Sequence, residues 1–150
     1  MLINSLNTSL MYEGVMTEIY ISGCIHNCDE CHNPELQQFD VGFEMSYTQI
    51  VNDLLERHEF FDGIVLTGGD PLCTPKNTNE LIDEIRDKLS DKKIWLYTGY
   101  TMEEINDNEK LLSIFNKCDV VFTDRFEKTM KCKGLTGSSN QRRWNNIIEV

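Results

Sequence analysis

The chain has 150 residues, of which 40% are hydrophobic and 26% charged, and it carries a formal net charge of −11. This length and composition are those of one globular domain, so we expect residues 1–150 to fold as a single unit. The negative charge argues against nucleic acid as a partner, and the lack of a run of about 18 apolar residues argues against a membrane span.

The N-terminal segment MLINSLNTSLMYEG lacks the basic start, the sustained apolar core and the small-residue cleavage site of a secretory signal. We therefore expect a cytoplasmic protein whose thiols are kept reduced. In that compartment, clustered cysteines favour metal binding over disulfide formation.

Signals for strands and helices alternate along the chain. Residues 15–22 are rich in β-forming residues and lead into a cysteine-rich loop. Residues 46–60 predict a helix that opens with a Ser46–Gln49 capping box, and residues 63–69 form the short apolar run of a buried parallel strand. The later elements are a helix over 77–89, a strand over 93–100, a helical stretch from Thr101 toward Asn116, a strand over 118–124 and a β-like segment over 145–150.

This alternation predicts an α/β fold, in which right-handed crossovers connect the strands of a parallel sheet. A closed eight-fold barrel needs about 200 residues or more, so the expected architecture is an open, partial (βα) barrel with a mainly parallel sheet. Ligands of such sheets gather at the carboxyl ends of the strands. The cysteine loop and the segments TGGDPL, TGY and TDRF all follow predicted strands, so we expect them to form one site.

The first of these loops holds three cysteines, Cys24, Cys28 and Cys31, at C-x3-C-x2-C spacing. A structural zinc ion usually has four protein ligands, and His26 or His32 would complete such a site, so zinc stays open as an alternative. A [4Fe–4S] cluster usually takes four cysteines, so a trio leaves one iron free for an external ligand. An open metal position indicates chemistry rather than structure. The other cysteines, Cys73, Cys118 and Cys132, are scattered and show no matching pair.

The segment LTGGDPL (66–72) follows the second core strand. Gly68 and Gly69 would allow a ligand to approach the backbone closely, although GGDP is also ordinary chemistry for a turn between a strand and a helix. Thr98 ends the next strand on the same edge of the sheet, where either a ligand contact or simple packing would account for it.

Together, the cysteine loop and the GGDP segment resemble the two motifs of the radical S-adenosylmethionine (radical SAM) superfamily, and the open partial barrel is then of the radical SAM type. The resemblance implies that Cys24, Cys28 and Cys31 bind a [4Fe–4S] cluster and act in catalysis, with S-adenosylmethionine chelating the fourth iron. GGDP resembles the GGE-type motif that binds the ammonium group of S-adenosylmethionine. Glu30 stands where an aromatic residue often precedes the third cysteine, and its backbone is expected to face the adenine. The cofactor-binding candidates are thus Glu30, His32, Gly68, Gly69, Asp70 and Thr98.

A narrower resemblance covers nearly the whole chain. GCIHNCDECHNP, TGGDPL, IWLYTGY, TDRF and GSSNQR (137–142) occur in the order seen in the activating proteins of anaerobic (class III) ribonucleoside-triphosphate reductases, in which glycine is common at the Glu30 position. This resemblance implies an enzyme that cleaves S-adenosylmethionine reductively. The resulting 5′-deoxyadenosyl radical would take a hydrogen from a glycine of the reductase, and a flavodoxin-like protein would donate the electron.

Other functions stay open from the sequence. The alternatives are the activase of another glycyl-radical enzyme or a radical SAM enzyme with a small substrate, and, from a different class, a non-catalytic zinc-binding interaction module. Residues 125–143 are also strongly basic, with Glu127 as their only acid, and form either a solvated face or a docking surface for an acidic protein or an anionic small molecule. The cations are Arg125, Lys128, Lys131, Lys133, Arg142 and Arg143.

Overall fold

The structure is a computed structural model that describes residues 1–150, except for the side chain of Met11. Eight strands form one sheet in the order β3-β1-β2-β4-β5-β6-β7-β8. The strands are β1 (Leu2–Tyr12), β2 (Gly14–Ile21), β3 (Phe43–Glu44), β4 (Gly63–Gly68), β5 (Lys93–Tyr97), β6 (Val120–Thr123), β7 (Arg142–Asn145) and β8 (Ile148–Glu149). The α-helices are α1 (Tyr47–Glu56), α2 (Pro75–Lys88), α3 (Met102–Asn106) and α4 (Glu109–Lys117). No helix in the described chain has the length and apolar character that crossing a membrane requires.

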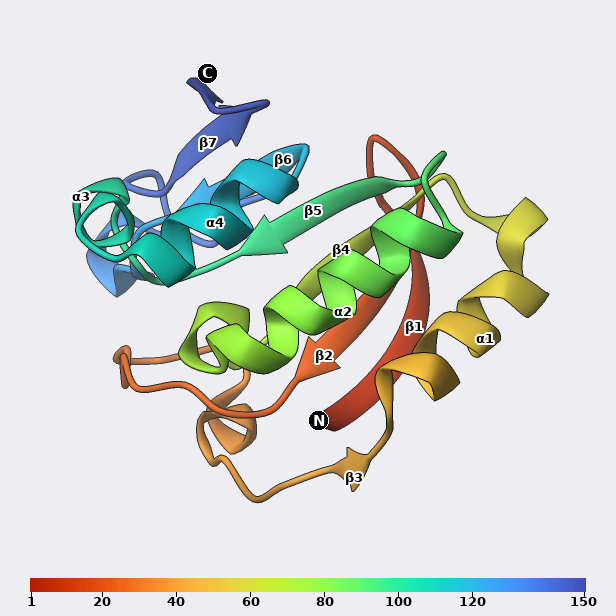
Figure 1. The fold of residues 1–150 in the computed structure, drawn as a ribbon. Helices are drawn as coiled ribbons and strands as arrows, with labels where there is room; N and C mark the ends of the chain where they lie inside the picture. Colours follow the sequence, from red (N-terminus) through yellow and green to blue (C-terminus); the bar gives the residue numbers. More distant parts are fainter.

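The centre of the sheet is parallel. β2, β4, β5 and β6 lie side by side and pair in parallel register. The crossovers between them carry the helices, and α1, α2 and α4 cover the same face of the sheet (Figure 1). α1 packs against α2, and α2 packs against α4. The expected α/β class and the open sheet are therefore confirmed.

The flanks of the sheet are antiparallel, which corrects the expectation of a mainly parallel sheet. β1 pairs with β2 and β3, and β7 pairs with β6 and β8, all in antiparallel register. No strand is predicted over Leu2–Tyr12, because LINSLNTSLMY interrupts its apolar residues with Asn and Ser, which are weak strand signals without a partner. Pairing with β2 supplies the hydrogen bonds that stabilise this polar strand.

The main core lies between the helices and the sheet. Helical spacing places the buried apolar residues of each helix on one side, where they meet the apolar residues of the central strands. The helical contribution is Ile50, Val51 and Leu54 of α1, Leu81, Ile82 and Ile85 of α2, and Leu111, Ile114 and Phe115 of α4. The strands contribute Ile19, Ile21, Ile64, Leu66, Ile94, Leu96 and Val121.

The helix-free face of the sheet is curved and lined with aromatic rings. Arg143 of β7 forms an ion pair with Glu13, at the turn between β1 and β2, with an N–O distance of 2.6 Å. Tyr12 contacts Trp95 edge-on, with 5.7 Å between the ring centroids. Because β7 and the β1–β2 turn belong to strands that are not neighbours in the sheet, these contacts require the sheet to bend toward its helix-free side.

Two predicted helices differ from expectation in their extent. The helix expected over 46–60 ends at Glu56, and a short 3-10 turn follows. The helical stretch expected from Thr101 toward Asn116 is divided into α3 and α4, because the side chain of Asn108 caps α4 by accepting hydrogen bonds from the backbone N–H groups of its first turn. The predicted capping box at Ser46 is present, and a second capping box, formed by Thr101 and Glu104, opens α3.

The capping box of α1 is expected to contribute measurably to stability. Ser46 accepts a hydrogen bond from the Gln49 backbone N–H at 3.1 Å, so the Ser46→Ala substitution should lower the free energy of unfolding by about 1 kcal/mol. Urea unfolding followed by circular dichroism measures this change. Thr48→Ala, an exposed neighbour in the same turn that makes no cap, is the matched control and should stay within about 0.5 kcal/mol of the parent chain. Equal losses in the two variants would contradict the assigned cap.

Candidate functional site

A cavity of about 260 Å³ lies at the carboxyl ends of β2, β4 and β5. The cysteine loop, the TGGDPL turn, the TGY segment and the segment after β6 all contribute to its wall, and so does the GSSNQR segment. The wall includes Cys24, Cys28, Cys31, His32, Gly68, Gly69, Asp70, Thr98, Gly99, Asp124, Phe126 and Gln141. The loops that were expected to meet at one edge of the sheet therefore do meet there.

The cysteine loop is held in shape by its own backbone. The Gly23 N–H donates to the Leu36 carbonyl oxygen at 2.8 Å, and the Cys24 N–H donates to that of Gln37 at 3.1 Å, which closes the base of the loop. Within the loop, the Cys31 N–H donates to the Cys28 carbonyl oxygen at 3.3 Å. All three thiols are free and half-buried, so they line the cavity without relying on disulfides.

Glu30 lies outside the cavity wall, with an exposed side chain. Its backbone has a φ of 56°, in the left-handed region that glycine adopts most easily. This conformation is a physical reason why glycine would be favoured at the position. The prediction that the Glu30 backbone faces a ligand stays a prediction.

The two glycines of GGDP allow two loops to pass close together. A Cβ atom at Gly69 would collide with the carbonyl oxygens of Gly23 and Leu36, and one at Gly68 would collide with the backbone of Ile21. The Gly69 N–H instead donates to the Ile21 carbonyl oxygen at 2.8 Å. The glycines are thus required by packing of the chain against itself, and their backbone also lines the cavity.

Asp70 is the anchor of the site. Its side chain is about 1% exposed, and its carboxylate accepts four hydrogen bonds from the protein. Oδ1 accepts from the Leu72 N–H at 2.9 Å. Oδ2 accepts from Thr98 Oγ1 at 2.9 Å and from the Gly99 N–H at 2.8 Å, and it lies 2.7 Å from His26 Nε2. Three of these bonds fall on Oδ2 and one on Oδ1, so Oδ1 keeps one of its two lone-pair sites.

Thr98 and His32 occupy different positions in the site. Thr98 is buried, and its hydroxyl donates to Asp70 while accepting from the Tyr100 N–H, so its side chain faces the protein. His32 is exposed at the rim of the cavity, where its ring lies 4.9 Å from that of Phe126.

His26 has a larger part in the structure than the sequence analysis gives it. Its side chain is about 2% exposed and packs edge-on against Tyr100, with 4.7 Å between ring centroids. Burial opposes a charge on the imidazole, but the hydrogen bond and the negative charge of Asp70 outweigh it and raise the pKa of His26. Asp70 is 44 residues away in the chain, so no local sequence pattern could reveal the pair.

Cys73 is the second residue whose place the sequence analysis misses. It lies in the 3-10 helix Pro71–Cys73, and its sulfur atom lies within 4.8 Å of that of Cys24. The interaction between the two thiols lowers the pKa of the Cys24 thiol to about 6 and raises the pKa of Cys73. Burial, in contrast, raises the pKa of the Cys28 thiol.

The GSSNQR segment braces one wall of the cavity. Gln141 Oε1 accepts from the Gly137 and Ser138 N–H groups, and its Nε2 donates to the Asp124 carbonyl oxygen. Asn140 Nδ2 donates to the Arg125 carbonyl oxygen at 2.8 Å. The segment therefore fixes the loop after β6, a role that the sequence analysis leaves unassigned.

Replacing the anchor should destabilise the chain even without any ligand. In Asp70→Asn, an amide that itself donates hydrogen bonds would face the donors Thr98 and Gly99, so we expect a loss of about 2–4 kcal/mol in the free energy of unfolding. Urea unfolding of the reduced, metal-free protein measures it. Asp40→Asn, at an exposed position, is the control and should change stability by less than about 0.5 kcal/mol. A stable Asp70→Asn variant would show that the anchor is dispensable.

Comparison with known proteins places the chain in a family. A family model described as a 4Fe-4S single cluster domain matches residues 12–144. The anaerobic ribonucleoside-triphosphate reductase-activating protein of Enterobacteria phage T4 is 34% identical over 143 residues, which are 91% of this chain and 88% of the relative. Proteins of the same name from Pasteurella multocida and Escherichia coli K12 are 33% and 32% identical, and each match covers at least 85% of this chain and 86% of the relative. The chain therefore belongs to the family of anaerobic ribonucleoside-triphosphate reductase-activating proteins, within the 4Fe-4S single cluster domains.

Proposed function

We propose that this chain is an enzyme that generates a glycyl radical on an anaerobic ribonucleoside-triphosphate reductase, with a [4Fe–4S] cluster and S-adenosylmethionine as cofactors. Its membership of the activating-protein family supports the reaction and the partner. The observation that carries the proposal is the group of three free cysteines on one loop, open to one cavity. The proposed fold is the open partial barrel of the radical SAM type, with which the curved open sheet agrees.

The residues present fit a cluster with one open iron. Cys24, Cys28 and Cys31 are the proposed ligands, and their thiols are half-buried and free of disulfides. A cluster held by these three thiolates would supply the one-electron reduction of S-adenosylmethionine from which the glycyl radical of the reductase derives. The backbone hydrogen bonds at the base of the loop keep the ligand positions in place.

The GGDP turn is the proposed site for S-adenosylmethionine. Gly68 and Gly69 present their backbone to the cavity beside the cysteine loop. The carboxylate of Asp70 already accepts four protein hydrogen bonds, so we assign it the role of holding this turn and the cysteine loop together. Thr98 has an indirect role, because its hydroxyl binds Asp70 and so holds the turn that would bind the cofactor. His32, at the rim of the cavity, and the backbone of Glu30 would contact S-adenosylmethionine from the outer side.

The alternative of a zinc-binding interaction module has less support than an enzyme. The matching family is described by a 4Fe-4S cluster, and the relatives are named for the activation of a reductase. A different glycyl-radical partner, or a small substrate, would use the same cavity, and the experiment below separates them from the proposed partner.

The decisive test is anaerobic electron paramagnetic resonance with the reductase of the same host. Reconstituted protein, S-adenosylmethionine, a reductant and the reductase should give a glycyl-radical doublet. Cys28→Ala should remove the doublet and the cluster signal together, because a proposed ligand is lost. Cys132→Ala, at an exposed cysteine outside the cavity, is the matched control and should keep both.

The failures of this test are informative. A cluster signal and free 5′-deoxyadenosine without a doublet would mean that another substrate is served. The absence of any cluster signal in the parent chain would reject the proposed cofactor.

The basic segment 125–143 divides into paired and unpaired cations. Arg125, Arg142 and Arg143 form ion pairs with neighbouring acids, and Lys128 pairs with Asp29 of the cysteine loop at 2.5 Å. In the described part of the chain, no ion pair involves Lys131 or Lys133. These two exposed lysines lie within three residues of Gly134, which lines the cavity together with Leu135. We infer that they receive an acidic, flavodoxin-like electron donor near the cysteine loop.

Neutralising the two free lysines should slow the delivery of the electron. We expect Lys131→Gln/Lys133→Gln to reduce the rate of radical formation with a flavodoxin-like donor about threefold to tenfold at low ionic strength, and salt should diminish the difference. Lys76→Gln/Lys110→Gln removes the same charge from exposed lysines on α2 and α4 and is the matched control. An equal effect in both pairs would mean that only net charge matters, and no effect in either would reject the docking surface.

A further inference from the structure

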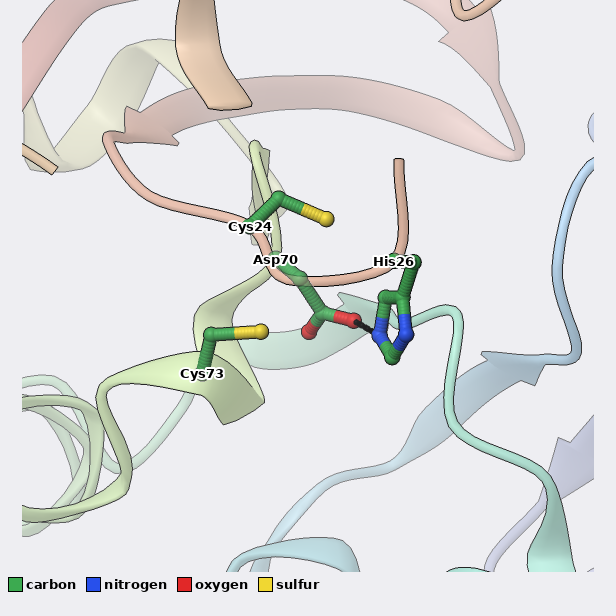
Figure 2. Close-up of side chains that lie close together, drawn as sticks. All are labelled: Cys24, His26, Asp70 and Cys73. Atoms are coloured by element: carbon green, nitrogen blue, oxygen red, sulfur yellow. Dashed lines mark hydrogen bonds and ion pairs between the residues drawn. The ribbon is translucent and has the colours of Figure 1, made fainter. Parts of the chain in front are cut away.

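Four side chains of metal-binding type converge beside the cavity. One donor atom from each of Cys24, His26, Asp70 and Cys73 lies within 4.8 Å of each of the others. Figure 2 shows the two sulfur atoms and the Asp70 carboxylate pointing into the same space, with His26 joined to the carboxylate. Among the described residues, neither Cys28 nor Cys31 belongs to this quartet. The quartet is therefore a different donor set from the cysteine trio, and the two sets share Cys24.

The two loops that carry the quartet are fixed relative to each other. The Asp70 N–H donates to the Gly23 carbonyl oxygen at 2.8 Å, which joins the GGDP turn to the residue before Cys24. Asp70 also caps the 3-10 helix that ends in Cys73, and the Cys73 N–H donates to the Asp70 carbonyl oxygen at 2.9 Å. These backbone hydrogen bonds thus keep the two loops, and the donor side chains that they carry, close together.

The chemistry of the quartet suits a zinc ion. Zinc binds thiolate, imidazole and carboxylate donors in a tetrahedron, at about 2.3 Å from sulfur and about 2.0–2.2 Å from nitrogen or oxygen. Ligand atoms in such a site lie roughly 3.3–3.8 Å apart, so the quartet would close on an ion with shifts of about 1 Å. The ion would replace the proton shared by His26 Nε2 and Asp70 Oδ2, which are 2.7 Å apart. Hydrogen bonds from Leu72, Thr98 and Gly99 already orient the carboxylate, as is usual for a metal ligand.

We propose that the cluster-free protein binds one zinc ion through Cys24, His26, Asp70 and Cys73. Because Cys24 is also a proposed ligand of the iron–sulfur cluster, this zinc ion and the cluster exclude one another. The chain then has two metal states, a zinc state that keeps the thiols of Cys24 and Cys73 from oxidation, and a cluster state that forms once zinc has left. The exclusion rests on the proposed function, whereas zinc binding itself does not.

The direct test is a metal titration of the full chain, freed of cluster and metal by a chelator and kept reduced and anaerobic. Zinc, in competition with a chromophoric chelator, should bind with one ion per chain. Cys73→Ser should weaken zinc binding by more than about 100-fold, because loss of a direct ligand exceeds the 10–100-fold cost of removing an outer hydrogen-bond partner. Cys28→Ser should bind zinc like the parent chain, since Cys28 is outside the quartet.

Cobalt(II) provides a second readout that needs no variant. Its absorption spectrum in the parent chain should indicate a tetrahedral site with two thiolate ligands. Cys132→Ser, which changes a cysteine exposed to solvent, is the matched control and should leave the spectrum and the zinc affinity unchanged. Circular dichroism of Cys73→Ser verifies that the variant is folded.

Several results would overturn the proposal. The parent chain failing to bind zinc would do so, and so would a cobalt spectrum with three thiolates. Loss of zinc binding in Cys28→Ser combined with normal binding in Cys73→Ser would place zinc on the cysteine trio instead.

The exclusion is tested separately by cluster reconstitution. Zinc added before iron and sulfide should block the appearance of the cluster in the parent chain, and a chelator should relieve the block. Simultaneous binding of zinc and a complete cluster would overturn the exclusion. Zinc binding is measured on cluster-free protein, so the two experiments can fail independently. A chain that binds no zinc could still form the glycyl radical, and a chain that forms no glycyl radical could still bind zinc.

Discussion

The structure depends on one buried carboxylate. Asp70 brings together the loops that follow β2, β4 and β5, by accepting from Leu72, Thr98 and Gly99 and by pairing with His26. Burial of an uncompensated carboxylate would be very costly, so these loops are stable in this arrangement only when all the donors are present. The position of the cysteine loop is therefore coupled to that of the next two strands.

The sequence predicts the parts of the fold that depend on local patterns. Periodicity and capping residues identify α1, α2 and the central strands, and spacing identifies Cys24, Cys28 and Cys31 as one group. β1 is missed because its strand character comes from its partner, and the antiparallel flanks are missed with it. The pairing of Asp70 with His26 and the place of Cys73 beside Cys24 are contacts across the fold, and no periodicity encodes them.

The site also illustrates how a small domain can use one residue in two ways. Cys24 belongs to the cysteine trio and also lies close to Cys73. The glycines of the turn matter because they have no side chain. Any side chain at Gly69 would separate the two loops that carry the metal-binding side chains. The close approach of the two loops thus depends on their backbone contact as much as on the reactive side chains.

The aromatic lining of the curved face has a consequence for access. Trp95 and Phe122 are buried there, and Tyr97 stacks on Phe122 with 4.5 Å between ring centroids. Together with Tyr12, which contacts Trp95, and the Glu13–Arg143 ion pair, these rings close the far end of the hollow. Tyr12 and Tyr97 also line the cavity, so this aromatic cluster forms one part of its wall. A molecule that reaches the cysteines therefore has to approach them from a part of the wall that these rings do not occupy.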